Sequence, residues 1–214
     1  TRTISQRDSY SEEATYIDKD STNKLSQSWD AQMRLEMEYQ IDSLNKLILR
    51  PQISYTNSTS AQTNDYTYDR DSIRINDGYQ HQNSLQEEIK ASMRATYNHK
   101  FAKPGRSLTM RANFNFTNTK GKTDTYAWDN LLNQALVDQN TLSGNNALSY
   151  SLRTSFVEPI YKKNHLLEMV LSFSGNNRHS VKNQYSMDSI TGDYQYDSIF
   201  SNELSNNMYT EQLE

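Results

Sequence analysis

The chain has 214 residues and a net charge of -4, and only 34% of the residues are hydrophobic although 15 are Tyr and 6 are Phe. So few apolar residues give a soluble domain a thin core, whereas so many aromatic residues exclude a disordered linker. The acidic balance argues against a nucleic-acid-binding protein, the absence of Cys excludes disulfides and thiol chemistry, and no apolar run approaches the roughly 20 residues of a transmembrane helix.

Strict alternation of apolar and polar residues, the period of a β-strand, begins in QMRLEMEYQI. Five apolar side chains share one face of this predicted strand: Met33, Leu35, Met37, Tyr39 and Ile41. A turn over residues 42–45 leads into LILRPQISYT, where the alternation resumes. The two segments predict a β-hairpin with one apolar and one polar face.

The pairing of this hairpin follows from keeping the two apolar faces together. That condition places Ile41 opposite Leu47 and Glu38 opposite Arg50, a pair of opposite charges on the polar face. Pro51 lacks an N–H group, so we expect a bulge or the loss of one ladder bond at that position.

The same unit recurs twice along the chain. IKASMRATYNHKF and LTMRANFNFT flank a turn at Pro104-Gly105, and YSLRTSF and LLEMVLSFS flank a turn near residues 161–164. We therefore predict three hairpins, near residues 31–56, 86–117 and 148–175.

Four polar stretches connect and flank these hairpins, near residues 1–30, 57–84, 118–147 and 176–205. We predict that they are long loops. One of them contains TYAWDNLLNQALV, in which apolar residues recur at spacings of three and four. This spacing predicts a short amphipathic helix.

Short turns that alternate with long loops, and strands of about 10 residues, are typical of an outer-membrane barrel. The sequence predicts an all-β protein over residues 1–214, an antiparallel transmembrane β-barrel segment of about six to seven strands with long polar outer loops. Aromatic residues near both ends of the strands fit the two girdles at the membrane interfaces. The alternative is a soluble β-sandwich with an aromatic core.

Two stretches, LEMEYQIDSLNKLILRPQISYT and SLRTSFVEPIYKKNHLLEMVLSFS, resemble barrel segments of Bacteroidota outer membrane proteins of the TonB-dependent-receptor type. The second carries a strand end at Glu158-Pro159-Ile160 and a strand start at Lys163-Asn164-His165-Leu166-Leu167-Glu168. The tail SITGDYQYDSIFSNELSNNMYT is similar to a loop of that family that runs into its next strand.

The resemblance implies a bacterial outer-membrane receptor with an N-terminal plug domain and a barrel of about 22 strands. The implied partners are outer-membrane lipid, the plug, the rest of the barrel and, through segments outside this chain, the TonB energy-coupling complex. Such a protein takes up a ligand without bond chemistry, so we expect no enzyme activity and no cofactor. The chain begins in polar sequence without Met, and we expect it to be a piece of a longer protein.

Aromatic residues of the predicted outer loops are the candidate ligand-binding residues: Tyr66, Tyr68, Tyr79, Tyr126 and Trp128. With neighbouring Asn and Asp they suit capture of a carbohydrate or a peptide by stacking and hydrogen bonds. The alternative is that they order the loops against one another. We expect no catalytic residues and no metal site, because the four His lack zinc spacing and the Asp clusters at 65–77 and 188–197 match no calcium-loop consensus.

Two functions remain open from the sequence. One is TonB-dependent uptake of an unidentified ligand through an outer-membrane barrel. The other is a structural or adhesive surface β-protein without transport activity.

Overall fold

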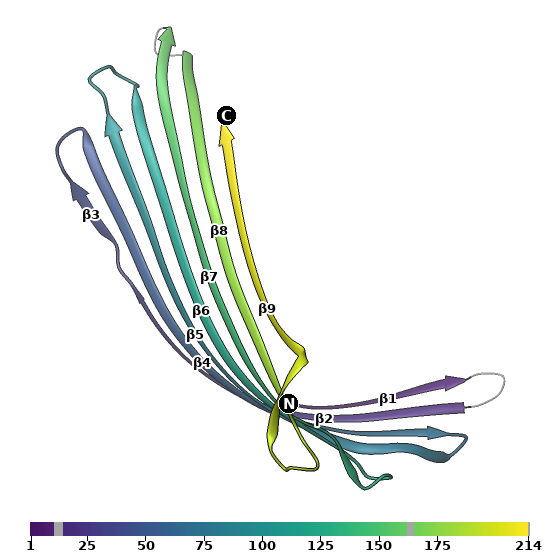
Figure 1. Ribbon diagram of the computed structural model, residues 1–214. Helices are drawn as coiled ribbons and strands as arrows, with labels where there is room; N and C mark the ends of the chain where they lie inside the picture. Colours follow the sequence, from purple (N-terminus) through teal and green to yellow (C-terminus); the bar gives the residue numbers. More distant parts are fainter. Residues whose placement is uncertain (11–14, 162–164, 214) are drawn as a thin grey trace.

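The computed structural model describes residues 1–10, 15–161 and 165–213, which form one antiparallel sheet of nine strands (Figure 1). The strands are β1 (Arg2–Tyr10), β2 (Thr15–Arg34), β3 (Met37–Gln40), β4 (Asn45–Arg70), β5 (Ile73–Lys100), β6 (Ser107–Asp129), β7 (Gln134–Tyr161), β8 (His165–Met187) and β9 (Tyr194–Leu213). The sheet therefore has more strands than the six to seven predicted, because β1 falls in a predicted loop and β2 and β3 share one predicted strand.

Apart from β2 and β3, which both pair with β4, strands that are neighbours in the chain are neighbours in the sheet, in the order β1-β2-β4-β5-β6-β7-β8-β9. The sheet is strongly curved (Figure 1). In the described residues it does not close on itself. An open antiparallel sheet of this kind fits a part of a β-barrel.

β2 and β3 form one line along β4 that is interrupted at Leu35 and Glu36. The Leu35 N–H donates to the Pro51 carbonyl at 3.0 Å, and Pro51 has no N–H to return the bond. This agrees with the predicted loss of one ladder bond at Pro51.

The predicted register of the first hairpin is wrong by two residues. Tyr39, not Ile41, lies opposite Leu47. Arg50 pairs with Glu36 at 3.0 Å instead of with Glu38. A shift of two residues leaves every side chain on its predicted face, because the period of a strand is two.

Asp42 explains this shift. Its carboxylate accepts N–H bonds from Leu44 at 2.7 Å and from Asn45 at 2.9 Å, which closes a tight turn centred on Ser43. The predicted register needed a turn centred one residue later.

The short turn between β5 and β6 lies at the same end of the sheet as the Asp42 turn. Residues 101–106 join β5 to β6 with a turn over residues 102–105, and Gly105 there has a positive φ of 86°, as the predicted turn at Pro104-Gly105 requires. The third predicted turn, near 161–164, falls largely on residues 162–164, which lie outside the described residues.

Arg106 and Lys103 both bond the Glu158 carboxylate at 2.6 Å, so they tie the 102–105 turn to β7 and lower the pKa of Glu158 to about 2.

The sheet is a single layer. Among the described residues, the buried hydrophobic side chains are Ala127 and Val170, whereas Leu152 and Met33 are 40% and 57% exposed. A β-sandwich would bury one face of each sheet against another sheet. The described part of the chain therefore does not form the soluble sandwich that the sequence left open.

Apolar side chains gather on one face, in the half of each long strand that lies next to the short turns. We call this surface the apolar band; it comprises the alternate residues of 47–55 in β4, 89–97 in β5, 108–116 in β6, 148–156 in β7 and 167–175 in β8. The register aligns its residues in cross-strand rows, one of which is Pro51, Met93, Phe114, Tyr150 and Gly175, and Tyr209 of β9 continues this row. The opposite face, the polar face, carries mainly Ser, Asn, Gln and Arg at the same level.

The segments predicted as long loops are strands over most of their described length, which corrects that prediction. β4 and β5 pair without a gap from Asn45–His99 up to Tyr68–Asn76, and their tip is a two-residue turn in which Asp71 and Ser72 both have positive φ, as a type I′ turn requires. Both faces are largely polar here, so apolar and polar residues no longer alternate in the sequence. The hydrogen-bond ladder continues nevertheless. We call this part of the sheet, beyond the apolar band, the projecting half.

The amphipathic helix predicted within TYAWDNLLNQALV is also wrong. β6 runs to Asp129, a turn follows, and β7 begins at Gln134. The Asp129 carboxylate accepts N–H bonds from Leu131 and Leu132 at 2.8 and 2.9 Å, and it thereby holds the turn. The spacing of three and four between apolar residues comes from the end of a strand followed by this turn, not from a helix. None of the described residues belongs to a helix long and apolar enough to cross a membrane.

Candidate functional site

The five aromatic residues predicted to bind a ligand lie in the projecting half, but the sheet divides them between its two faces. Tyr79, Tyr126 and Trp128 share the face of the apolar band, by register. Tyr66 and Tyr68 lie on the polar face, by the alternation along β4. The structure therefore brings Tyr79, Tyr126 and Trp128 together and places Tyr66 and Tyr68 apart from them.

The first group forms an aromatic cluster. The rings of Tyr79 and Tyr126 are 6.3 Å apart, those of Tyr126 and Trp128 are 6.4 Å apart and stacked, and His81 lies 4.9 Å from Tyr79. Burial, with Tyr79 and Asp138 nearby, raises the pKa of Tyr126. These contacts join side chains of the neighbouring strands β5 and β6.

The second group covers the polar face. Tyr66 lies directly opposite Gly78, and its ring occupies the space that a Cβ on Gly78 would need, with the hydroxyl 2.6 Å from that position. Tyr68 stacks on Tyr16 of β2 at 5.8 Å, and Arg70 lies over the Tyr16 ring at 5.8 Å. The aromatic rings thus contact one another and the backbone across three strands.

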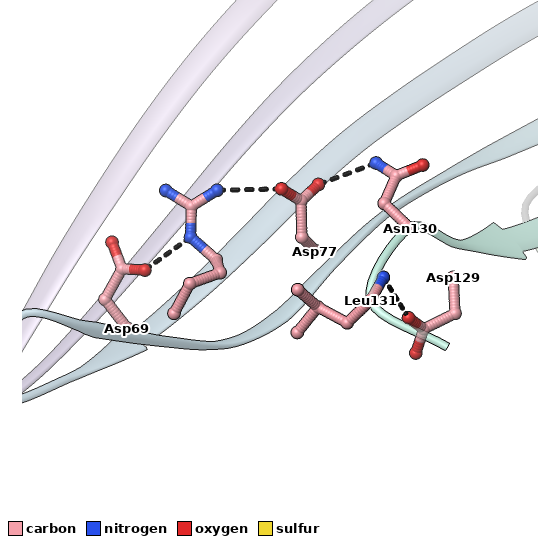
Figure 2. A network of polar contacts seen from close by, with 6 residues as sticks. Asp69, Asp77, Asp129, Asn130 and Leu131 are labelled. Atoms are coloured by element: carbon pink, nitrogen blue, oxygen red, sulfur yellow. Dashed lines mark hydrogen bonds and ion pairs between the residues drawn. The ribbon is translucent and has the colours of Figure 1, made fainter. Parts of the chain in front are cut away.

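A polar network joins the tips of two projecting hairpins (Figure 2). Arg74 bonds Asp69 at 2.5 Å and Asp77 at 2.9 Å. The Asn130 side chain donates to the Asp77 carboxylate at 2.7 Å, and the Asn130 N–H donates to the Asp77 carbonyl at 2.8 Å. The β4–β5 hairpin is therefore fastened to the turn between β6 and β7.

The predicted acidic clusters are engaged in local structure. Arg74 bridges Asp69 and Asp77, while Asp188 and Asp197 accept backbone N–H bonds from Ile190 and Ile199 at 2.8 and 3.0 Å. Within the described ranges, no three His, Asp or Glu side chains come together as metal ligands would.

The structure brings together a set of residues that the sequence reasoning missed. Five Arg lie at the level of the apolar band on the polar face of neighbouring strands, and they are Arg34, Arg50, Arg94, Arg111 and Arg153. The signal was present in the sequence as a repeated Met-Arg or Leu-Arg pair in QMRLE, LILRP, ASMRA, LTMRA and YSLRT. We call these residues the arginine row.

Known proteins add little to this picture. No family model matches the sequence, and no curated protein matches it. The structure is similar to that of the ferric citrate transporter FecA in the unliganded form, with a TM-score of 0.33 and 12% identity over 96% of this chain and 37% of that one. It is similar to the ferric yersiniabactin uptake receptor FyuA from Yersinia pestis, with a TM-score of 0.28 and 8% identity over 94% of this chain and 42% of that one.

The chain thus spans less than half of the length of each of these two structures. Both TM-scores are low, so the functional assignment of this chain rests on its own register and side-chain pattern.

Proposed function

We propose that this chain forms part of the wall of a bacterial outer-membrane β-barrel of the TonB-dependent-receptor type, which takes up an unidentified ligand. The observation that carries the proposal is the apolar band, an exposed apolar surface on one face of a single-layer sheet whose other face is polar at the same level. Such a surface is unstable in water and needs an apolar environment. Outer-membrane lipid supplies that environment, and the polar face then lines the interior.

The height of the band supports this proposal. Nine residues in each of β4 to β7 extend about 30 Å along the strand at about 3.3 Å per residue. At the tilt of about 35–45° found in outer-membrane barrels, this length covers roughly 21–25 Å of membrane, close to the apolar height of about 25 Å in such barrels. The projecting half then stands in water on the outer side.

Aromatic residues at the borders of the band fit the same placement. Trp29 and Tyr55 meet edge to face at 5.7 Å where the band ends toward the projecting half. Phe101 contacts His99 at 4.3 Å and Phe156 at 5.9 Å at the short-turn border. Girdles of aromatic residues flank the apolar zone of outer-membrane barrels at both interfaces.

The two edges of the sheet account for the partners that we propose. One edge of the sheet is β9, and the other is β1 with the part of the line of β2 and β3 that β1 does not pair; both edges carry backbone groups that no further strand of the described chain pairs, and unpaired edges promote aggregation. Strands from the rest of the protein would complete the ladder and close the barrel. A plug domain would lie against the polar face, and contact with the TonB complex would come from segments outside this chain.

A structural or adhesive surface protein is the second candidate. The observation that favours it is the projecting half, whose hairpins are paired to their tips and fastened to each other through Asp77 and Asn130. An ordered surface above the membrane suits adhesion as well as ligand capture. Neither function requires bond chemistry, and we propose that the chain is not an enzyme.

Fractionation of the full-length protein tests the proposal. We expect it to sediment with the outer membrane on a density gradient and to need detergent for release. A full-length protein that stays soluble without detergent would contradict the proposal. Binding to the purified periplasmic domain of TonB separates the two candidates, because the receptor binds it and an adhesive protein does not.

A further inference from the structure

The arginine row places like charges directly opposite one another. Arg50 lies opposite Arg94 between β4 and β5, and Arg111 lies opposite Arg153 between β6 and β7. Like charges in cross-strand pairs destabilise a sheet. An anion placed beside Arg50 and Arg94 would offset the repulsion between these two.

A hollow on the polar face lies at one end of this row. It has a volume of about 490 Å³, and its described lining includes Arg34, Arg50 and Arg94 together with one carboxylate, that of Glu36. Three positive charges against one negative charge leave an excess of two positive charges (3 - 1 = 2). The hollow therefore matches a ligand with two negative charges.

The orientation of the guanidinium groups fits the same ligand. Arg34 donates from Nε to the amide oxygen of Gln52 at 3.2 Å, and Arg94 donates from Nε to the amide oxygen of Asn113 at 3.0 Å. Both bonds use a neutral acceptor and Nε alone, so they fix the plane of each guanidinium without using its terminal nitrogens. Terminal guanidinium nitrogens held in this way bind a carboxylate or a phosphate with two parallel hydrogen bonds.

The third Arg of the hollow has a different role. Arg50 bonds the Glu36 carboxylate at 3.0 Å, and Glu36 lowers the local positive charge next to it. Arg34 and Arg94 are thus the two groups of the hollow that remain for a ligand.

We propose that the hollow between Arg34, Arg50 and Arg94 binds an anionic ligand with two acid groups, either carboxylates or phosphates. One acid group is held by Arg34 and the other by Arg94, and Arg50 contributes through its charge. The inference deepens the proposed function, because it names the chemical class of the ligand for the polar face, and it rests on that function only for the position of this face inside a barrel.

Calorimetric titration of the full-length protein in detergent tests the inference. The probes are succinate and inorganic pyrophosphate, with the neutral succinamide as the matched control ligand. We expect saturable binding of at least one diacid that weakens as salt is added, and no binding of succinamide. Comparison of the two diacids shows whether the acid groups are carboxylates or phosphates.

The double variant Arg34→Gln/Arg94→Gln should bind the diacid at least about tenfold more weakly, because each substitution removes a charged hydrogen-bond donor from one acid group. The control is Arg178→Gln: Arg178 also donates from Nε to an amide oxygen, that of Asn145, at 2.8 Å. Arg178 lies outside the arginine row, so its loss should leave the affinity unchanged.

A second measurement separates lost binding from lost folding. Without a diacid, Arg94→Gln should melt at the same or a higher temperature than the wild type, because it removes the like charge opposite Arg50. Absence of diacid binding by the wild type would overturn the inference. This holds even if the cause is a carboxylate from another segment of the same protein that occupies the hollow. Equal affinity in the wild type and the double variant would overturn it as well.

The two proposals fail separately. A protein that binds the diacid but is not found in the outer membrane would contradict the proposed function and leave the anion site intact. A protein that is found in the outer membrane but does not bind the diacid would contradict the anion site and leave the proposed function intact.

Discussion

The apolar band and the projecting half are built on one continuous hydrogen-bond ladder but carry different surfaces. Between β6 and β7 the register runs unbroken from Ser107–Val157 to Ala127–Val137. In the band one face is apolar and the other polar, whereas in the projecting half both faces are largely polar. The backbone ladder therefore forms in both settings, and the alternation of side chains reports the environment of a strand rather than its existence.

β7 contains a matched pair of residues that sharpens this comparison. Leu152 lies in the band and Leu142 in the projecting half, on the same face of the same strand, and they are 40% and 42% exposed. They differ in the environment that our proposal assigns to them, lipid for Leu152 and water for Leu142.

The largest effect is expected for Leu152→Arg. A charge on the lipid face near the middle of the membrane costs about 2–4 kcal/mol, whereas Leu142→Arg should change the free energy of unfolding by no more than about 0.5 kcal/mol. Urea unfolding of the full-length protein in lipid vesicles measures both values. Equal effects of the two substitutions would show that the band is not in lipid.

Gly78→Ala is expected to have the next largest effect. The new Cβ would lie 2.3 Å from the Trp128 carbonyl oxygen and 2.6 Å from the Tyr66 hydroxyl. Overpacking of this kind costs about 1–3 kcal/mol. Gly144→Ala is the control, because no atom lies within 4 Å of the Cβ it would add.

Gly175→Ala extends the same test to the band. The nearest atoms to its Cβ would be those of the Tyr150 side chain, at 2.5 Å, and a side chain can rotate away where a backbone carbonyl cannot. We expect a smaller loss in thermal stability than for Gly78→Ala. A larger loss at Gly175 would mean that the tyrosine ring is fixed more firmly in the band than the backbone is in the projecting half.

The Glu158 contacts predict a pH dependence at the short-turn end of the sheet. Arg106 and Lys103 lower the pKa of Glu158 from its usual 4.5 to about 2. A carboxylate with a lowered pKa stabilises the fold above its ordinary pKa, and this contribution is lost as the pH falls from about 4.5 through about 2. The melting temperature of Glu158→Gln should therefore be lower than that of the wild type at neutral pH.

The difference between these two proteins should shrink as the pH falls toward 2. Melting curves measured across this range test the prediction. A difference that stays constant with pH would mean that the charge of Glu158 contributes nothing.

The smallest effect is expected for Asn130→Ala. It removes the side-chain bond to Asp77 at 2.7 Å but leaves the backbone bond between the same two residues. The global stability should change by no more than about 0.5 kcal/mol. Amide hydrogen exchange should become faster only near the hairpin tips, and faster exchange throughout the band would contradict a local role for this bond.

The part of the fold that could be predicted from the sequence is the part with two unlike faces. The alternation in QMRLEMEYQI and LTMRANFNFT located strands and assigned their faces correctly. The register of the first hairpin could not be fixed in this way, because a shift of two residues preserves the faces and only the Asp42 turn selects between the alternatives.

The projecting half escaped prediction because Thr, Ser, Asn and Tyr occupy both of its faces. The candidate site was limited for a related reason: Tyr66 and Tyr79 are close in sequence, yet alternation across the turn at Asp71 and Ser72 puts them on opposite faces. The arginine row was missed for a different reason. Its members are far apart in sequence, and only the register of the strands places them near one another on one face.

Lipid exposure along β7 tests the central claim most directly. The sequence contains no Cys, so single Cys substitutions at each position of 140–156 can carry a spin label in the full-length protein in vesicles. We predict that oxygen, which concentrates in lipid, reaches the labels at the even positions from 148 to 156, and that the label at position 142 is reached by a water-soluble relaxation agent instead. Equal access of the water-soluble agent to positions 152 and 142 would contradict the assignment of the apolar band to a membrane.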